Sequence, residues 1–251
     1  MRNAVIEKLV ALAHQNDNIA LVVGDLGYSV IENFAREFPD RFINAGVAEQ
    51  NMTGLAAGMA SEGYHVFTYS IANFPTFRCA EQFRNDIDYQ GLPVTVVAVG
   101  GGLAYGAMGY SHHAIQDLAL MRVMPNTLIA APGDPLEAAS CLEYLVTNPQ
   151  SSYLRLGKTG EKTFHPRAPS LVPGVWVRVH VSHSSDNVIL CTGATLSIAM
   201  DMIAMKQYQE YSVFTLPLWS MRCKSSQPKQ VAQCSKVITL ENHLHDAGFG
   251  S

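Results

Sequence analysis

Residues 41–60 read RFINAGVAEQNMTGLAAGMA. The pattern predicts a short buried strand that ends near Ile43, a turn at Gly46, and a helix over residues 47–60 with apolar side chains three and four positions apart. Glu49 falls in the first turn of that helix. A carboxylate there is often only a cap, because negative charge is favoured at the positive end of a helix dipole. The alternative is that Glu49 points out of the turn and binds a ligand.

Strands and helices alternate over the first 160 residues. Five apolar runs are typical of strands that are buried on both faces. A chain in which such strands alternate with helices is expected to form a parallel sheet covered on both faces. The predicted strands are Ile19–Val23, 66–70, 93–99, 127–131 and 153–157. One helix is predicted to begin after Asn73, which would cap it, and two more are predicted over 115–122 and 134–146.

Loops at the carboxyl ends of such strands are where open α/β sheets bind ligands. Asp25 and Ser29 follow the first strand, so they are site candidates as well as ordinary turn and cap residues. Phe74, Phe77 and Arg78 share one side of the next predicted helix. An aromatic pair at this spacing is more often part of a core than of a ligand site.

A glycine-rich stretch, GGGLAYGAMGYSHH, covers residues 100–113. Its glycines allow close backbone approach, but neither a P-loop nor a dinucleotide fingerprint is present. His112 and His113 are adjacent, so their side chains diverge and no metal site is predicted. Arg155 and Lys158, near the end of a predicted strand, could bind a phosphate or a carboxylate, although a solvated basic residue is an equal alternative.

The segment FINAGVAEQNM resembles the signature of the pyrimidine-binding domain of transketolase-like, thiamine-diphosphate-dependent enzymes. The resemblance implies that Glu49 is catalytic and holds N1′ of the cofactor's aminopyrimidine ring. It also implies that Phe77 or Phe74 stacks on that ring, with Arg78 and Asp25 among the cofactor-binding residues.

Two further motifs extend the resemblance toward substrate. The GDLGYS segment is similar to the family's Asp-Leu-x-x-Ser element, which implies that Ser29 lies in the substrate channel. The glycine-rich stretch is similar to the family's G-x-D-G-x-T-H-Q segment, so His112 is implied to bind substrate and donate protons. Met108 and Gly100 depart from the family, because they stand where an aspartate and a phosphate-binding histidine are expected. The sugar specificity therefore stays open, and Arg155 and Lys158 are further candidates for substrate binding.

Composition narrows the class of protein. The chain has 251 residues, a net charge of −4 and no run of basic residues. The sequence therefore shows no basic patch of the kind that binds nucleic acid. Five cysteines without a C-x-x-C pair predict reduced thiols rather than disulfides or zinc. No apolar run approaches the ~20 residues of a membrane helix, and the N-terminus lacks the apolar core of a signal peptide. We expect a cytoplasmic protein that is not bound to a membrane.

The expected organisation is a transketolase-like pyrimidine-binding domain over residues 1–160, a proline-containing linker over 161–174, and a smaller α/β domain over 175–251. In the second domain, strands are predicted over 187–193, 211–216 and 236–241, and helices over 194–208 and 225–234. The resemblance implies that this C-terminal domain is incomplete, because the family continues with further strands.

The resemblance also implies that half of the active site is absent from this chain. In the family, Mg²⁺ and the cofactor's diphosphate are held by a G-D-G motif followed by an asparagine in another domain, and this chain has no such pair. We therefore expect a split transketolase that transfers a two-carbon ketol unit from a ketose or its phosphate to an aldose. Its partner would be a separate diphosphate-binding subunit. The resemblance implies a homodimer of this chain or a heterotetramer with that partner. The alternatives are the β subunit of a 2-oxo acid dehydrogenase E1, an enzyme like 1-deoxyxylulose-5-phosphate synthase, or a non-catalytic α/β interaction subunit.

Overall fold

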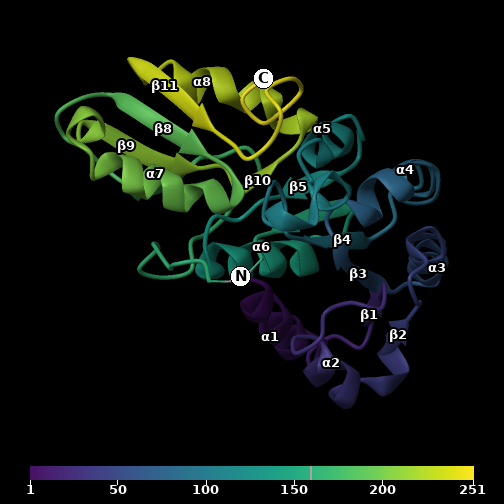
Figure 1. Cartoon of the computed structure of the whole chain (residues 1–251). Helices are drawn as coiled ribbons and strands as arrows, with labels where there is room; N and C mark the ends of the chain where they lie inside the picture. The colour runs from purple at the N-terminus through teal and green to yellow at the C-terminus, as the bar shows by residue number, and fades with distance from the viewer. Residues whose placement is uncertain (159) are drawn as a thin grey trace.

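The apolar run IALVV forms β1 (Ile19–Val23), which is fully buried inside a seven-stranded sheet. Figure 1 presents the computed structural model, which describes residues 1–158 and 160–251. The strand order of this first sheet is β10-β5-β6-β4-β3-β1-β2. Its other strands are β2 (Phe42–Asn44), β3 (His65–Ile71), β4 (Val94–Val99), β5 (Leu128–Ala130), β6 (Ser152–Leu156) and β10 (Leu218–Trp219).

All neighbouring strands of the first sheet are parallel except β10, which pairs antiparallel with β5. In the register, Leu21 of β1 lies between Phe42 of β2 and Phe67 of β3. Parallel strands place their carboxyl ends at one edge of a sheet. The loops that follow β1, β2, β3, β4 and β6 therefore meet on the same side of the molecule.

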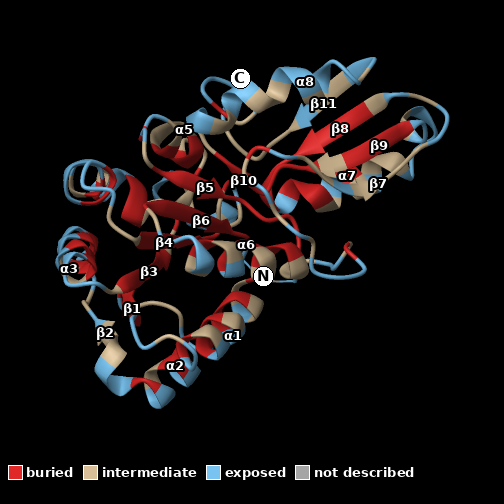
Figure 2. Ribbon diagram, turned by 180° about the vertical axis from the view of Figure 1, so that it is seen from behind, coloured by how far each residue is buried: buried red, intermediate tan, exposed pale blue. Residues whose placement is uncertain are grey.

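Helices cover both faces of this sheet, and Figure 2 shows its central strands as buried. One face packs against α1 (Arg2–Ala13), α2 (Glu32–Glu37) and α6 (Pro135–Thr147). The other packs against α3 (Glu49–Ser61), the η3 turn (Phe83–Asp88) and α5 (Asp117–Arg122), and the short α4 (Ala80–Gln82) lies beside α3. Asp134 caps α6 by accepting a hydrogen bond from the Glu137 amide at 2.8 Å.

A second, four-stranded sheet has the order β11-β8-β9-β7, and β7 is its one antiparallel strand. It contains β7 (Val177–His180), β8 (Asn187–Cys191), β9 (Tyr211–Thr215) and β11 (Lys236–Leu240), with α7 (Leu196–Ile203) and α8 (Gln227–Val231). Short 3-10 and π-helical turns complete the chain: η1 (Pro39–Arg41), η2 (Phe74–Arg78), η3 (Phe83–Asp88), η4 (Gly106–Met108), η5 (Tyr110–His112), η6 (Gly193–Thr195), η7 (Lys206–Tyr208) and η8 (Met221–Ser226).

The predicted fold class is confirmed, but several elements differ from the sequence prediction. The strands β7 and β10 and the helix α2 were not predicted. The predicted helix over 194–208 is regular only in α7, with 3-10 turns on either side. The β10 strand comes from the part predicted as the second domain and completes the edge of the first sheet, so the two units share that edge.

Among the residues that the structure describes, no helix is long and apolar enough to cross a membrane. All five cysteines are free thiols, and Cys79, Cys141 and Cys191 are buried. Burial raises the pKa of Cys79 to about 11, so this thiol stays protonated at neutral pH.

Candidate functional site

The carboxyl edge of the first sheet brings together almost all of the predicted site residues. Asp25 and Ser29 follow β1, Glu49 follows β2, and the η2 turn with its two phenylalanines follows β3. His112 lies in the long loop after β4, and Lys158 follows β6. Only Arg155, which lies within β6 itself, is not in one of these loops.

Glu49 is the first residue of α3, and its side chain is only 2% exposed. Its Oε2 accepts a hydrogen bond from Arg78 Nη1 at 3.0 Å. Its Oε1 is buried and has no hydrogen-bond partner among residues 1–158 and 160–251. No helix amide of the described chain donates to this carboxylate, which is unlike a cap. A buried carboxylate oxygen without a partner is rare in folded proteins, so it marks a position where a ligand can donate a hydrogen bond.

The segment that pairs with Glu49 is π-helical rather than α-helical. Such turns are uncommon and are frequent at functional sites. The Arg78 guanidinium lies 4.2 Å from the centroid of the Phe74 ring, a cation–π contact. Phe77 is 49% exposed and lines a hollow of about 550 Å³ together with Asn73 and Tyr110. Phe77 is therefore the more accessible of the two rings.

His112 reaches this segment from the loop after β4. Its ring lies 5.1 Å from the ring of Phe74, and its Nδ1 is 3.0 Å from Ser111 Oγ. Asn73 was predicted to cap a helix, but its Nδ2 instead donates to the Ser111 carbonyl at 2.7 Å. The side chain of Asn73 therefore links the two loops and holds His112 beside Phe74.

A small cavity of about 220 Å³ continues the site beside the loop after β1, and Arg2, Tyr69 and Tyr105 are among its lining residues. Arg2 Nε is buried without a partner in the described part of the chain. Burial raises the pKa of Tyr69 to about 12 and also raises the pKa of Tyr105, so both phenols remain neutral donors. Lys158 lies 5.0 Å from the Tyr105 ring, which in turn lies 6.2 Å from the His112 ring.

Arg2 and Tyr105 were not predicted from the sequence. Arg2 stands at the start of a helix, where a basic residue carries no signal of its own. Tyr105 stands in a loop whose glycines and histidines are the more conspicuous residues. Arg2 lies next to Tyr69 and Tyr105 only because the fold brings the N-terminus to this edge of the sheet, so the sequence alone does not indicate the contact.

Asp25 and Ser29 are exposed and sit in a strained turn. Their φ angles are 55° and 64°, a region that residues other than glycine rarely adopt. Asn44 steadies the turn, because its Nδ2 donates to Asp25 Oδ1 at 2.9 Å and its Oδ1 accepts from the Asp25 amide at 3.2 Å. Backbone strain of this kind often accompanies functional sites.

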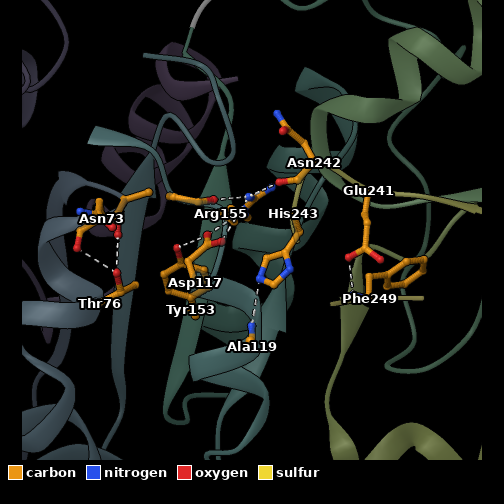
Figure 3. Close-up of polar contacts among 12 residues, drawn as sticks. Asn73, Thr76, Asp117, Ala119, Tyr153, Arg155, Glu241, Asn242, His243 and Phe249 are labelled. Atoms are coloured by element: carbon orange, nitrogen blue, oxygen red, sulfur yellow. Dashed lines mark hydrogen bonds and ion pairs between the residues drawn. The ribbon is translucent and has the colours of Figure 1, made fainter. Parts of the chain in front are cut away.

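Arg155 was predicted to bind substrate, but it is buried inside the chain. Its Nε donates to Asp117 Oδ2 at 2.7 Å, and its Nη2 donates to the carbonyls of Ala114 and Asn242 (Figure 3). Burial alone would lower the pKa of Arg155, but the neighbouring Asp117, Tyr153 and Glu241 together raise it. The guanidinium is thus permanently charged and occupied by internal partners.

Carboxylate, histidine and thiol side chains are not grouped in a way that could hold a metal ion, as far as the described residues extend. The site therefore consists of an open carboxylate with its arginine, two aromatic rings, a histidine, and a cationic far end at Arg2 and Lys158. This arrangement can bind a flat heteroaromatic ring next to a polar, negatively charged molecule.

Comparison with known proteins gives consistent matches. Residues 1–160 match the family described as the transketolase pyrimidine-binding domain. The whole chain is 29% identical to one of the subunits of an apulose-4-phosphate transketolase from Phocaeicola vulgatus, and it covers 81% of that subunit. It is also 29% identical to a putative transketolase C-terminal section from Methanocaldococcus jannaschii, of which it covers 79%. A solved structure described as a split-gene transketolase, an inactive β4 tetramer, matches 99% of this chain and 81% of its own, with a TM-score of 0.86 and 30% identity.

Proposed function

This chain belongs to the transketolase pyrimidine-binding domain family, and we propose that it is the part of a split, thiamine-diphosphate-dependent transketolase that binds the cofactor's aminopyrimidine ring. The observation that carries the proposal is the Glu49 carboxylate. It is buried, one oxygen is paired with Arg78, and the other has no partner within the described residues. A ring nitrogen of the cofactor would supply the missing hydrogen bond to Glu49 Oε1.

The chain's residues fit the cofactor at three points. Glu49 Oε1 would hydrogen-bond N1′, and the accessible ring of Phe77, or that of Phe74, would stack on the aminopyrimidine. Arg78 would keep Glu49 oriented, and Asp25 would face the cofactor from the loop after β1. When bound, thiamine diphosphate supplies the carbon nucleophile and the electron sink of the reaction.

The remaining site residues suit a sugar substrate. His112 would exchange a proton with a substrate oxygen, because it lies in the loop next to the phenylalanines. Ser29 would donate a hydrogen bond from the loop after β1, and Lys158 would attract a negatively charged end of the sugar. Transfer of a two-carbon ketol unit from a ketose to an aldose is the reaction that we propose for the assembled enzyme, of class EC 2.2.1.

A partner chain would provide the diphosphate half of the site, including the Mg²⁺ ligands. The sequence has no G-D-G motif followed by an asparagine at the expected distance. Large exposed apolar side chains surround the carboxyl edge, and such clusters mark interfaces. These residues are Tyr28, Val47, Phe77, Leu103 and Tyr110. We propose a heterotetramer of two such chains and two partner subunits, and the relative described as an inactive β4 tetramer is consistent with a chain that assembles but needs its partner.

Two further expectations belong to the proposal. We propose a division of the chain into residues 1–160, a linker over 161–174, and residues 175–251. The family match over residues 1–160 supports the first of these boundaries. A cytoplasmic location is supported by the five free thiols, since reduced cysteines are usual in that compartment.

The test is calorimetric titration with thiamine diphosphate and Mg²⁺. We expect no micromolar binding to this chain alone, and micromolar binding when a chain that carries the G-D-G and asparagine motif is added. Substrate turnover should appear only in the mixture. Tight binding to the isolated chain, or a mixture that neither binds nor turns over, would contradict the proposal.

A further inference from the structure

We propose that residues 241–251, here named the C-terminal segment, hold the loop of residues 100–113 in place, and that Asn242 and His243 are positioning residues for His112. The inference rests on the proposed function for its catalytic meaning, but its structural part concerns this chain alone. The C-terminal segment extends from the second unit, and three separate contacts join it to the loop or to residues that flank the loop. Figure 3 shows two of them, the hydrogen bonds of Asn242 with Arg155 and of His243 with Ala119.

The first contact is the buried guanidinium of Arg155. Its Nη2 donates to the Ala114 carbonyl at 2.8 Å and to the Asn242 carbonyl at 3.0 Å. Ala114 closes the neck of the loop, because it exchanges two backbone hydrogen bonds with Gly102, at 2.8 and 2.9 Å. One buried cation therefore joins the end of the loop to the C-terminal segment, and Asp117 holds that cation in place at 2.7 Å.

The second contact explains three consecutive glycines. A Cβ at Gly100 would clash with the ring of Tyr105, a Cβ at Gly101 would lie 2.6 Å from Arg155 Nε, and a Cβ at Gly102 would clash with the side-chain amide of Asn242. The close approach that the sequence suggested for a ligand is thus made by the chain's own side chains. Asn242 packs directly on the backbone where the loop begins.

The third contact fixes the helix that follows the loop. His243 Nδ1 donates to the Leu244 carbonyl at 2.7 Å, which leaves Nε2 as an acceptor for the Ala119 amide at 3.3 Å. Ala119 lies in the first turn of α5, whose own N-cap residue, Gln116, makes no capping side-chain hydrogen bond. His243 therefore caps α5 from a remote part of the sequence.

The C-terminal segment is itself folded back and anchored. The Glu241 carboxylate accepts hydrogen bonds from the amides of Phe249 at 2.5 Å and Gly250 at 3.0 Å. The Phe249 ring lies 5.7 Å from that of Trp219, in the strand that completes the first sheet. The loop that carries His112 is consequently held at both ends by residues more than a hundred positions away in the sequence.

Hydrogen exchange measured by mass spectrometry on the isolated chain tests the structural part. His243→Ala and Asn242→Ala should each speed exchange of the amides in residues 102–114 by about tenfold, because local opening becomes easier. His245→Ala is the matched control, since that side chain is fully exposed, and it should change nothing. Unchanged exchange in both variants would overturn the proposal whether or not the assembled enzyme is active.

A rescue experiment isolates the Asn242 contact. Gly102→Ala should loosen the same amides, partly through its φ of 68° and partly through the clash with Asn242. Asn242→Gly in the same chain should restore part of the protection, and no rescue would refute the contact. In the assembled enzyme, His243→Ala should raise the substrate KM several-fold with a smaller change in kcat. Faster exchange throughout the chain rather than in residues 102–114, together with an unchanged KM, would assign the residue to general stability and refute the positioning role.

Discussion

Two buried carboxylates in this chain are paired with arginines, and the two pairs have opposite characters. The Asp117–Arg155 pair is closed: Asp117 Oδ2 accepts from both Arg155 Nε and the Tyr153 hydroxyl at 2.7 Å, and its Oδ1 accepts from Arg155 Nη2. The Glu49–Arg78 pair is open, with one hydrogen bond of 3.0 Å, an arginine that is half exposed, and a carboxylate oxygen without a partner in the described chain.

The difference separates a structural pair from a ligand site. A buried charge that has all its partners inside the protein stabilises one arrangement of the elements around it. A buried charge that lacks a partner costs free energy, so it is retained where a bound molecule supplies the missing hydrogen bond. Both pairs combine a buried acid with an arginine, and they differ in their hydrogen bonding and in the exposure of the arginine.

The largest expected effect concerns the open pair. Glu49→Gln keeps the size of the side chain but alters its acid–base character, so deprotonation of C2 of thiamine diphosphate should slow by a factor on the order of 10²–10⁴ in the assembled complex. The measurement is exchange of the C2 proton for deuterium. The free energy of unfolding should change by less than ~1 kcal/mol, because the amide oxygen can still accept from Arg78 and solvent stabilises the half-exposed guanidinium.

The control for this prediction is the binding of the cofactor. Calorimetry must find thiamine diphosphate bound in both proteins, so that a lost rate reflects chemistry rather than occupancy. Exchange rates that agree within about threefold would mean that the open oxygen of Glu49 is not the contact with N1′, because the lost acid–base group should cost far more.

The closed pair predicts a large loss of stability instead. Arg155→Met leaves Asp117 buried without its counter-charge, which should cost about 3–5 kcal/mol of unfolding free energy in urea titrations. Arg78→Met at the open pair should cost about 1 kcal/mol, because solvent replaces a half-exposed arginine. Equal losses in the two variants would remove the distinction between the pairs.

Much of the fold was predictable because local pattern and tertiary structure agree. The apolar run of β1 was predicted with its correct bounds, and Asp134 followed by Pro135 correctly indicated the start of α6. The β10 strand was missed because it has two residues and owes its conformation to pairing with β5. The π-helical turns after Asn73 also could not be anticipated, since their apolar spacing resembles that of an α-helix.

The candidate site was predictable only where a motif names a residue. Glu49 could be selected from its place after a short strand and from the resemblance, but its partner Arg78 and the open oxygen depend on side-chain geometry. Arg155 and Lys158 are three positions apart, and the sequence treats them alike. The first points into a buried network and the second is exposed, because only Arg155 lies in a strand that is covered on both faces.

The pH dependence of stability tests whether an unpartnered buried atom is enough to define a site. His65 is buried at the amino end of β3, its Nε2 contacts Thr95 Oγ1 at 3.0 Å, and its Nδ1 has no partner in the described residues. Burial lowers the pKa of His65 to about 4, so between pH 6.5 and 4 the unfolded chain binds a proton that the folded chain does not. The stability should therefore fall as the pH drops through this window, by about 3 kcal/mol in total, and this group should have no effect above it.

Urea titrations across the window provide the measurement. His65→Gln should flatten the pH dependence of the unfolding free energy, and the substitution His183→Gln at an exposed histidine should preserve it. Because His65 is enclosed at the opposite edge from the candidate site, His65→Gln should change the pH dependence of stability without slowing C2 deprotonation, whereas Glu49→Gln should slow C2 deprotonation with little change in stability. If His65→Gln slowed C2 deprotonation as much as Glu49→Gln, an unpartnered buried atom would no longer locate the site.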